Sequence, residues 1–423
     1  MLTCHTSDSA ASIQYHQGHH IIYLPSPTSD TLRDWIDLRV NTVMLENEIP
    51  ALSIAVIQGG DILIQKGYGV LNRETKLAVD AHSIYQIASD TKKMTGIIAR
   101  SMTMEGIIDP HASITDYIPQ LDATTTAKLA AVTLHGLLTH KSGVPYKAPR
   151  DLRVDGEPMT DPYTAEELVL DLADIELIAT PGEKFAYSNF GFAIAGYVLQ
   201  QASGLSYEAL LQRYVFEPCG MIQSTTDASV VNQSQLVTPY RKEDRFAATK
   251  PFVMGELKAA GGVFSSVHDL TNLMMRQIES YADLSASQIE TSPFILTEMT
   301  GVEGNDYGYG LGKKVFGTGV QYGHGGDLDG YASGYVFSPQ YKSGVILLTS
   351  SGGSWVGELE KEILYKLTNR TYTPPKTSFA QALFDQINSV GMDTALVWAN
   401  EHLTDNTYYY DEVHRRSFHF PIG

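Results

Sequence analysis

Short apolar runs typical of β-strands stand near both ends of this 423-residue chain, and helical patterns fill the stretch between them. Residues 52–57 and 62–69 are two such runs joined by the turn Gly59-Gly60-Asp61, which predicts a β-hairpin. Runs rich in β-branched and aromatic residues return at 335–337 and 344–349. Because strands need partners to bury their apolar faces, we expect these distant segments to share one sheet, in an α/β (α+β) domain interrupted by a helical insert.

The places where the patterns change give the expected domain boundaries. Residues 1–30 are rich in Ser, Thr and His without periodicity, and we expect them to form a flexible leader. The α/β domain is assigned to 31–90 and 256–370, the helical insert to 91–255, and a helical C-terminal tail to 371–423. The cleft between sheet domain and insert is the natural place for a site. Helical spacing of apolar residues is clearest at 32–43, 96–105, 165–177, 192–202, 207–214, 357–367, 379–389 and 393–403.

Composition excludes several classes of protein. Asp and Glu number 48 against 30 Lys and Arg, which gives a net charge of −18 and a field that repels nucleic acids. Hydrophobic residues make up 43% of the chain, which excludes disorder of the whole chain. No apolar run approaches the ~20 residues of a membrane-spanning helix. We therefore expect no nucleic-acid partner and no membrane span.

The first residues bear on localisation. Met1 is followed by polar residues instead of a basic and then an apolar segment, so we expect a soluble protein without an export signal, cytoplasmic as written. The alternative is that Leu2-Thr3-Cys4 is the stub of a lipoprotein whose signal was removed, which would place the protein in the periplasm or outside the cell. The two cysteines, Cys4 and Cys219, cannot build a disulfide framework.

A serine followed three residues later by a lysine stands where the strand pattern gives way to the first helix of the insert. Ser89-Asp90-Thr91-Lys92 is the only such pair in the chain. On a helix this spacing places hydroxyl and ammonium on one face, with Cβ atoms about 5–6 Å apart. Lys92 would then accept the Ser89 proton if burial lowers its pKa, or would keep another base ionised. Asp90 is expected to point away from that face, as a solvated or capping carboxylate.

A second motif, Tyr187-Ser188-Asn189, follows a loop and precedes a helical run. A phenol serves as a general base only if a neighbouring cation lowers its pKa from ~10, and Lys92 is the obvious cation. The Asn189 amide would hold a substrate carbonyl or the Lys92 ammonium. The alternative is a packed loop tyrosine, with Asn189 bonded to its own backbone.

The third motif is Gly323-His324-Gly325-Gly326, ahead of the strand at 335–337. Glycines let a strand approach a ligand closely, and free backbone N–H groups supply oxyanion donors. His324 would bind a carboxylate or steer a proton. The alternative is a tight turn with a surface histidine.

Together and in this order, the three motifs resemble the serine β-lactamase and penicillin-binding-protein superfamily. The resemblance is to the branch of class C β-lactamases, D-Ala-D-Ala carboxypeptidases, D-aminopeptidases and related esterases, and it spans about residues 32–367. It implies a β-lactamase/transpeptidase-like fold, in which an antiparallel sheet is flanked by helices and carries an inserted all-helical domain. Further segments that carry it are 137–143, 181–185, 216–221, 260–266 and 309–312.

Carried over by position, the resemblance implies that Ser89 is the acylated nucleophile and that Lys92 activates it. Tyr187 would act as base and then as acid toward the leaving group, and Asn189 would orient the substrate. The backbone N–H groups of Ser89 and Asp327 would form the oxyanion hole. Water would then hydrolyse the acyl-enzyme.

The third motif departs from the family, because β-lactamases of this branch usually carry Lys-Thr-Gly where this chain has His324-Gly325-Gly326. The cation for a β-lactam carboxylate is therefore weaker or pH-dependent, and the threonine hydroxyl is missing. We still expect His324, Gly325, Gly326 and Asp327 to contact substrate. The departure favours a peptidase, amidase or esterase over a β-lactamase.

No cofactor or metal is expected. His16, His19 and His20 have no Cys or Glu partner at ligand spacing. The glycines at 308, 310 and 312 lack the strand, helix and acidic residue of a dinucleotide-binding motif.

The predicted function is a serine hydrolase that acts through a covalent acyl-enzyme on small esters, amides or D-amino-acid-containing peptides. One alternative is a β-lactamase, and another is a penicillin-recognising sensor or scaffold that is acylated without turnover. The expected partner is a small-molecule or peptide substrate, and the sequence leaves the oligomeric state open.

Overall fold

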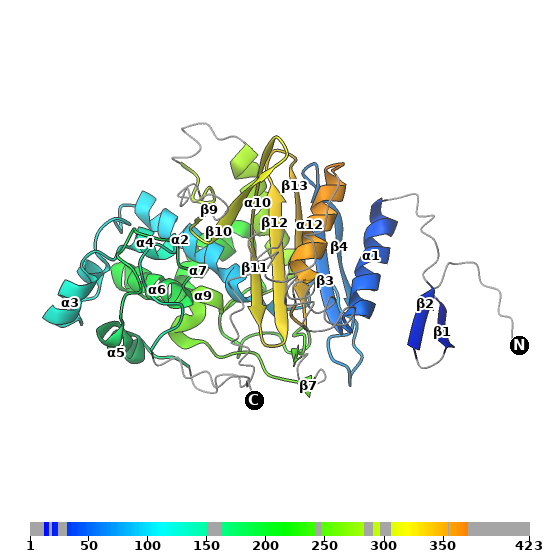
Figure 1. Cartoon of the computed structure of the whole chain (residues 1–423), viewed down its shortest axis with the longest axis horizontal. Helices are drawn as coiled ribbons and strands as arrows, with labels where there is room; N and C mark the ends of the chain where they lie inside the picture. Colours follow the sequence, from blue (N-terminus) through cyan, green and yellow to red (C-terminus); the bar gives the residue numbers. More distant parts are fainter. Residues whose placement is uncertain are drawn as a thin grey trace, which may run out of the picture. The chain divides into compact units, whose positions relative to one another are not determined.

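A seven-stranded antiparallel sheet forms the centre of the fold, in the order β4-β3-β13-β12-β11-β10-β9 (Figure 1). Strands from the two ends of the chain meet in it, because β3 pairs with β13 through Ile54↔Leu347 and Val56↔Val345. The predicted hairpin, the shared sheet and the α/β fold class are thus confirmed. The strands are β3 (Ala51–Gln58), β4 (Asp61–Gly69), β9 (Asp306–Gly308), β10 (Leu311–Phe316), β11 (Gly319–Leu328), β12 (Tyr331–Ser338) and β13 (Ser343–Thr349).

The computed structural model describes residues 12–16, 19–23, 32–149, 162–241, 247–282, 291–296, 306–353 and 355–370. The predicted tail helices at 379–389 and 393–403 lie outside these ranges. In the leader, β1 (Ser12–His16) and β2 (His19–Tyr23) form an antiparallel hairpin, where the sequence predicts no regular element. Ile and Tyr, which favour strands, recur in both segments and give the local reason. Within the described ranges no helix is long and apolar enough to cross a bilayer.

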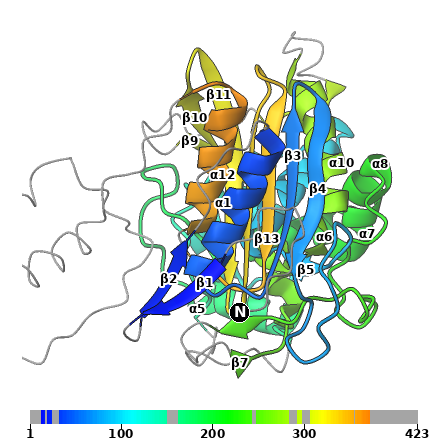
Figure 2. The same ribbon diagram turned by 90° about the vertical axis from the view of Figure 1, so that its right-hand side faces the viewer.

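Two helices cover one face of the sheet, α1 (Leu32–Glu46) and α12 (Trp355–Leu367). Figure 2 shows both in front of the sheet, with α10 (Val267–Ala282) behind it. The apolar face of α1 packs with that of α12 and with the outward side chains of β3 and β13 in one buried cluster. Alternate residues of each strand point to the other face, where a larger cluster joins the sheet to α10 and to the helices of the middle segment.

The middle of the chain is mainly helical, as predicted. The helix α6 (Asn189–Ser203) begins where the Ser188 hydroxyl accepts a hydrogen bond from Gly191 N–H, and it ends at Gly204 in the left-handed conformation. A division into domains at residues 90/91 and 255/256 stays a prediction. The other helices and turns are η1 (Ala88–Thr91), α2 (Lys92–Met104), η2 (Ile114–Tyr117), α3 (Ala123–Leu129), α4 (Leu134–Leu138), α5 (Ala165–Asp174), α7 (Tyr207–Leu211), η3 (Gln212–Phe216), α8 (Glu217–Cys219), η4 (Gly255–Leu257) and α9 (Lys258–Gly261).

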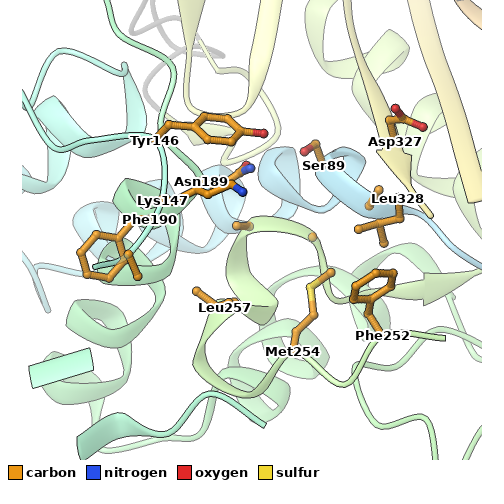
Figure 3. Close-up of a pocket in the computed structure, with 14 residues that line it drawn as sticks. Ser89, Tyr146, Lys147, Asn189, Phe190, Phe252, Met254, Leu257, Asp327 and Leu328 are labelled. Atoms are coloured by element: carbon orange, nitrogen blue, oxygen red, sulfur yellow. The ribbon is translucent and has the colours of Figure 1, made fainter. Parts of the chain in front are cut away.

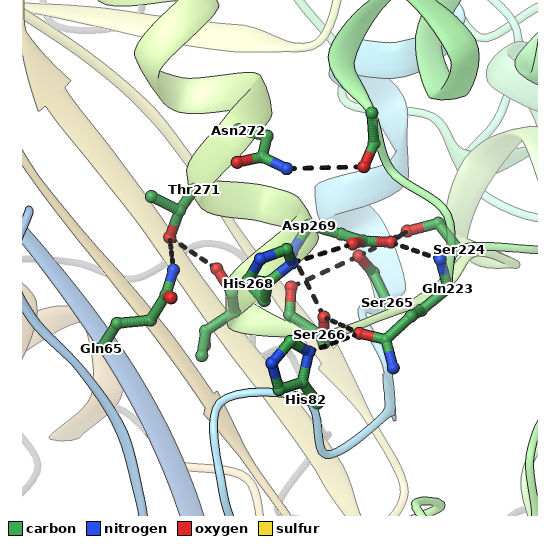
Figure 4. A network of polar contacts seen from close by, with 12 residues as sticks. Gln65, His82, Gln223, Ser224, Ser265, Ser266, His268, Asp269, Thr271 and Asn272 are labelled. Carbon is green, nitrogen blue, oxygen red and sulfur yellow. Dashed lines mark hydrogen bonds and ion pairs between the residues drawn. The ribbon is translucent and has the colours of Figure 1, made fainter.

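A buried polar network anchors the short strand β8 (Phe264–Ser265), which pairs with β5 (Tyr85–Gln86). At its centre the Asp269 carboxylate accepts hydrogen bonds from Gln223 N–H and from the Ser224 hydroxyl, both at 2.8 Å (Figure 4). Ser224 also contacts Ser265 at 2.8 Å. Neutral donors thus satisfy a fully buried carboxylate at the start of α10.

Candidate active site

Ser89 lies in η1, directly before α2, at the predicted strand-to-helix junction. The turn is held on both sides, because Ile87 N–H donates to Val263 O at 2.9 Å and Val263 N–H donates to Thr91 Oγ1 at 3.1 Å. Ala88 has a φ of 51°, a left-handed conformation that costs a non-glycine residue about 1–2 kcal/mol. This fixed turn presents Ser89, half-buried, to a cleft.

Lys92 is fully buried, and its ammonium contacts the serine that the spacing predicts. Its Nζ donates to Ser89 Oγ at 2.9 Å, to Asn189 Oδ1 at 2.7 Å and to Ala260 O at 2.7 Å. These acceptors come from η1, α6 and α9. Three elements that are distant in sequence therefore fix one ammonium beside one hydroxyl.

Tyr187 lies just before α6, close to both Lys92 and Ser89. The Lys92 Nζ is 5.1 Å from the centre of the Tyr187 ring, and the Tyr187 side chain is hydrogen-bonded to that of Ser89. Burial raises the pKa of Tyr187 above its usual range, and the contact with Ser89 opposes this only in part. The sequence predicts that Lys92 lowers this pKa; in the structure burial prevails, so the phenol is protonated at neutral pH.

Asn189 is the first residue of α6, where the capping hydroxyl of Ser188 fixes the helix start. Its side-chain oxygen accepts a hydrogen bond from Lys92 Nζ, one of the two roles predicted for this amide. With Oδ1 on the ammonium, the amide nitrogen remains as the donor for a substrate carbonyl. Ser89, Lys92, Tyr187 and Asn189 are thus brought together, while the catalytic roles predicted for them stay predictions.

His324 lies inside strand β11, not in a tight turn. Its Nδ1 is 2.5 Å from Gly325 O, and its Nε2 is 3.0 Å from the Tyr307 hydroxyl. A carbonyl only accepts, so Nδ1 carries the hydrogen and Nε2 accepts from Tyr307. Burial and the nearby Lys92 lower the pKa of His324 to about 3. The imidazole is therefore neutral at neutral pH and supplies no cation for a substrate carboxylate.

The glycines of the third motif bring β11 against the serine turn. A Cβ atom on Gly326 would lie 2.2 Å from Ile87 O and 2.9 Å from Ala88 Cβ, so only glycine fits there. Gly325 is exposed, and a Cβ there would meet only Ser333 O at 3.5 Å. Asp327 follows and lines the same cleft as Ser89. The oxyanion hole of Ser89 and Asp327 N–H groups stays a prediction, with both residues in the lining of one cleft.

The cleft encloses about 610 Å³ of space open to solvent. Figure 3 shows Ser89 between Asn189 on one side and Asp327 on the other, with apolar side chains below. That apolar wall consists of Phe252, Met254, Leu257 and Leu328. The exposed Tyr146 and Lys147 complete the rim beside Asn189. The sequence does not predict these lining residues, because they come from separate segments and belong to no chemical motif.

His140 is a second residue that the motif chemistry misses. It is fully buried, its Nδ1 accepts from Ser188 N–H at 3.0 Å, and its ring centre lies 4.2 Å from that of Tyr187. Burial and the charge of Lys92 lower its pKa well below the usual value, so it is neutral. A neutral imidazole therefore packs against the Tyr187 ring. In the sequence, the signal for His140 is its position in the segment 137–143, which carries part of the family resemblance.

Asp90 corrects an expectation. The sequence places it away from the Ser89–Lys92 face as a solvated or capping carboxylate. The direction is right, but Asp90 is fully buried and lies 2.5 Å from the Lys93 ammonium. The helical spacing gives the direction; the sheet that covers this side of the turn comes from the other end of the chain. Among the described residues, no group of three or more His, Cys, Asp and Glu could hold a metal ion.

The chain is similar in sequence to a known protein family and to several known proteins. Residues 33–369 match the family model described as Beta-lactamase. Protein flp of Staphylococcus aureus (strain COL) is 22% identical over 357 residues, which cover 84% of this chain and 70% of that protein. The D-alanyl-D-alanine-carboxypeptidase/endopeptidase AmpH of Escherichia coli (strain K12) is 23% identical over 325 residues, 76% of this chain and 79% of that protein.

Solved structures are similar over the same region. The octameric penicillin-binding protein homologue from Pyrococcus abyssi has a TM-score of 0.69 and 29% identity, and the match covers 80% of this chain and 77% of that one. A class C beta lactamase from Rhodobacter sphaeroides has a TM-score of 0.66 and 18% identity, with 79% and 98% covered. The resemblance drawn from the motifs is confirmed. The chain belongs to the beta-lactamase family, a family of serine hydrolases.

Proposed function

We propose that this protein hydrolyses small esters, amides or D-amino-acid-containing peptides through an acyl-enzyme on Ser89. The observation that carries the proposal is the contact of a fully buried ammonium, Lys92 Nζ, with Ser89 Oγ at 2.9 Å. When the Lys92–Tyr187 pair carries one proton fewer, as amine and phenol or as ammonium and phenolate, it can take the serine proton as the hydroxyl attacks a carbonyl.

The steps follow from the groups present. Ser89 Oγ attacks the acyl carbon, and its proton passes to the Lys92–Tyr187 pair. The oxyanion is held by the Ser89 and Asp327 N–H groups. The bond to the leaving group breaks as its oxygen or nitrogen takes a proton from Tyr187, which burial keeps protonated at neutral pH. Water then attacks the ester on Ser89, with the proton transfers reversed.

The cleft supports a preference among substrates. With His324 neutral, the third motif offers no fixed cation to a carboxylate beside the scissile bond, which disfavours β-lactams. The wall of Phe252, Met254, Leu257 and Leu328 favours an apolar acyl group. Esters and amides with such acyl groups are therefore the first substrates to test.

The test is turnover of p-nitrophenyl acetate, butyrate and hexanoate, followed by D-aminoacyl amides, D-Ala-D-Ala peptides and β-lactams. Ser89→Ala is expected to abolish turnover, whereas Ser229→Ala, at an exposed serine, is expected to leave it unchanged. Sustained activity in Ser89→Ala would refute the assignment. A stoichiometric burst with every substrate would instead favour an acylated sensor without turnover.

A further inference from the structure

Two ionisable side chains, Asp90 and Lys93, are buried together on the side of the serine turn that faces the sheet, and a third, Glu360, is buried on the other face of the sheet. Asp90 and Lys93 have no exposed surface, and Glu360 of α12 retains 7%. The Lys93 ammonium lies 2.5 Å from Asp90 Oδ1 and also donates to the Asp90 backbone carbonyl at 3.0 Å. One ammonium thus holds both the side chain and the main chain of the residue next to Ser89.

The pair is pressed against strand β12. Lys93 Nζ lies 3.7 Å from the centre of the Tyr335 ring, which adds a cation–π contact. The Tyr335 hydroxyl donates to Gln277 Oε1 of α10 at 2.8 Å, so the ring itself is fixed. A separate bond, from Ser333 Oγ to Ile87 O at 2.8 Å, ties the same strand to the start of the turn.

Glu360 of α12 lies on the opposite face of the sheet, against Gly334 of β12. A Cβ atom on Gly334 would lie 2.4 Å from Glu360 Oε2 and 3.2 Å from Val356 Cγ1, so the missing side chain makes room for the carboxyl group. The next residue, Tyr335, points to the Lys93 face, because successive strand residues alternate. Burial raises the pKa of Glu360 well above its usual range; Lys361, and after it Lys93, oppose that shift, and Asp90 adds to it.

Burying ionisable side chains costs free energy, because their charges lose their hydration. Buried ion pairs contribute little net stability, and apolar groups of the same size often serve as well. The pair adds a directed contact to the backbone beside Ser89, where a small misplacement costs a large factor in rate.

We propose that Asp90 and Lys93 are positioning residues that hold the η1 turn, and with it Ser89 Oγ, in the geometry for acylation. The inference rests on the proposed function of Ser89. It assigns to the second lysine of the motif a role distinct from that of the first.

The test is the double variant D90N/K93M, which removes both charges at nearly constant volume. Acylation by p-nitrophenyl butyrate is followed by stopped flow, together with substrate affinity and Tm. We expect Tm within a few degrees of the parent and affinity within twofold, because the cleft wall is untouched. The acylation rate is expected to fall on the order of 10- to 100-fold.

Asp90→Asn alone is the second variant, since a buried amine without its carboxylate partner can remain neutral. It is expected to slow acylation in the same direction. The matched control is Asp269→Asn, at the buried carboxylate outside the cleft (Figure 4), which is expected to lower Tm while leaving acylation by the folded protein unchanged.

Parental acylation rates in folded D90N/K93M and Asp90→Asn would overturn the positioning role and leave the proposed function standing. A parent protein in which no acylation depends on Ser89 would overturn both.

Discussion

Lys92 and Lys93 are consecutive, both fully buried, and lie on opposite sides of the turn that carries Ser89. The Lys92 ammonium donates to a hydroxyl, an amide oxygen and a carbonyl, all in the cleft wall. The Lys93 ammonium contacts a carboxylate, a carbonyl and an aromatic face beneath the sheet. One residue of separation along the chain thus takes a cation from the cleft into the core.

The contacts of the two buried lysines suit them to different roles. A lysine that is hydrogen-bonded to a serine hydroxyl can take up the serine proton when it is a neutral amine, so its environment governs reactivity. An ammonium held by a carboxylate balances that charge and fixes geometry. The comparison therefore predicts that changes at Lys92 alter rate with little effect on stability, and that changes at Lys93 alter stability strongly.

The largest effect is expected for Lys92→Met. Without the lysine nitrogen, Ser89 loses a member of the pair that takes its proton, and kcat/KM for p-nitrophenyl butyrate should fall by about 10³-fold or more. Tm should change by only a few degrees, because Met fills the same space. A variant that keeps more than a tenth of the parental kcat/KM would contradict the role assigned to Lys92.

Lys93→Met is expected to cost about 3–5 kcal/mol of unfolding free energy, since it leaves Asp90 buried without its cation. Urea denaturation at neutral pH measures this. The cycle with Asp90→Asn and the double variant should show that the second substitution recovers most of the loss. If Lys93→Met and Lys92→Met destabilise equally, the two lysines do not differ as described.

Gly334→Ala tests the close packing of Glu360 against strand β12. The new methyl group would meet Glu360 and Val356, and we expect a loss of about 1–3 kcal/mol in unfolding free energy from overpacking. The matched control is Gly357→Ala on α12, the helix that carries Val356 and Glu360; a Cβ there meets nothing within 4 Å. It should be neutral or stabilise by about 0.5–1 kcal/mol. Equal changes in unfolding free energy at both glycines would contradict the close packing of Glu360 on Gly334.

The smallest effect concerns acid stability. Below pH 6.5 the unfolded chain protonates His324, while the folded protein does so only near its lowered pKa of about 3. The unfolded state then binds more protons, so the free energy of unfolding decreases as pH falls through this window. Because the ring is partly exposed, His324→Gln should reduce the loss between pH 6.5 and 5 by only about 1 kcal/mol. Identical urea midpoints against pH in both proteins would contradict this.

The sequence predicts some parts of this picture well. The spacing of Ser89 and Lys92 is local, so a helical turn suffices to predict their contact. The sheet follows from strand patterns at 52–57 and 344–349, because such strands need partners. The direction of Asp90, away from the cleft, follows from the same helical geometry.

Other parts depend on contacts that no local pattern encodes. Burial of Asp90 beside Lys93 requires β12 to cover the turn, and the approach of Glu360 requires a glycine on a strand from another part of the chain. The raised pKa of Tyr187 likewise comes from packing around the phenol. The lining residues Phe252 and Met254 converge on the cleft only in the folded chain.

The most direct test of the central claim is the site of the acyl group. The protein is mixed with p-nitrophenyl butyrate, quenched in acid within the burst, digested and analysed by peptide mass spectrometry, with Ser89→Ala alongside. We predict a butyryl group on Ser89 in the parent and no adduct in the peptide that contains position 89 in the variant. A parent that turns over the ester with Ser89 unmodified, or a variant that is acylated at an equal rate elsewhere, would contradict the account.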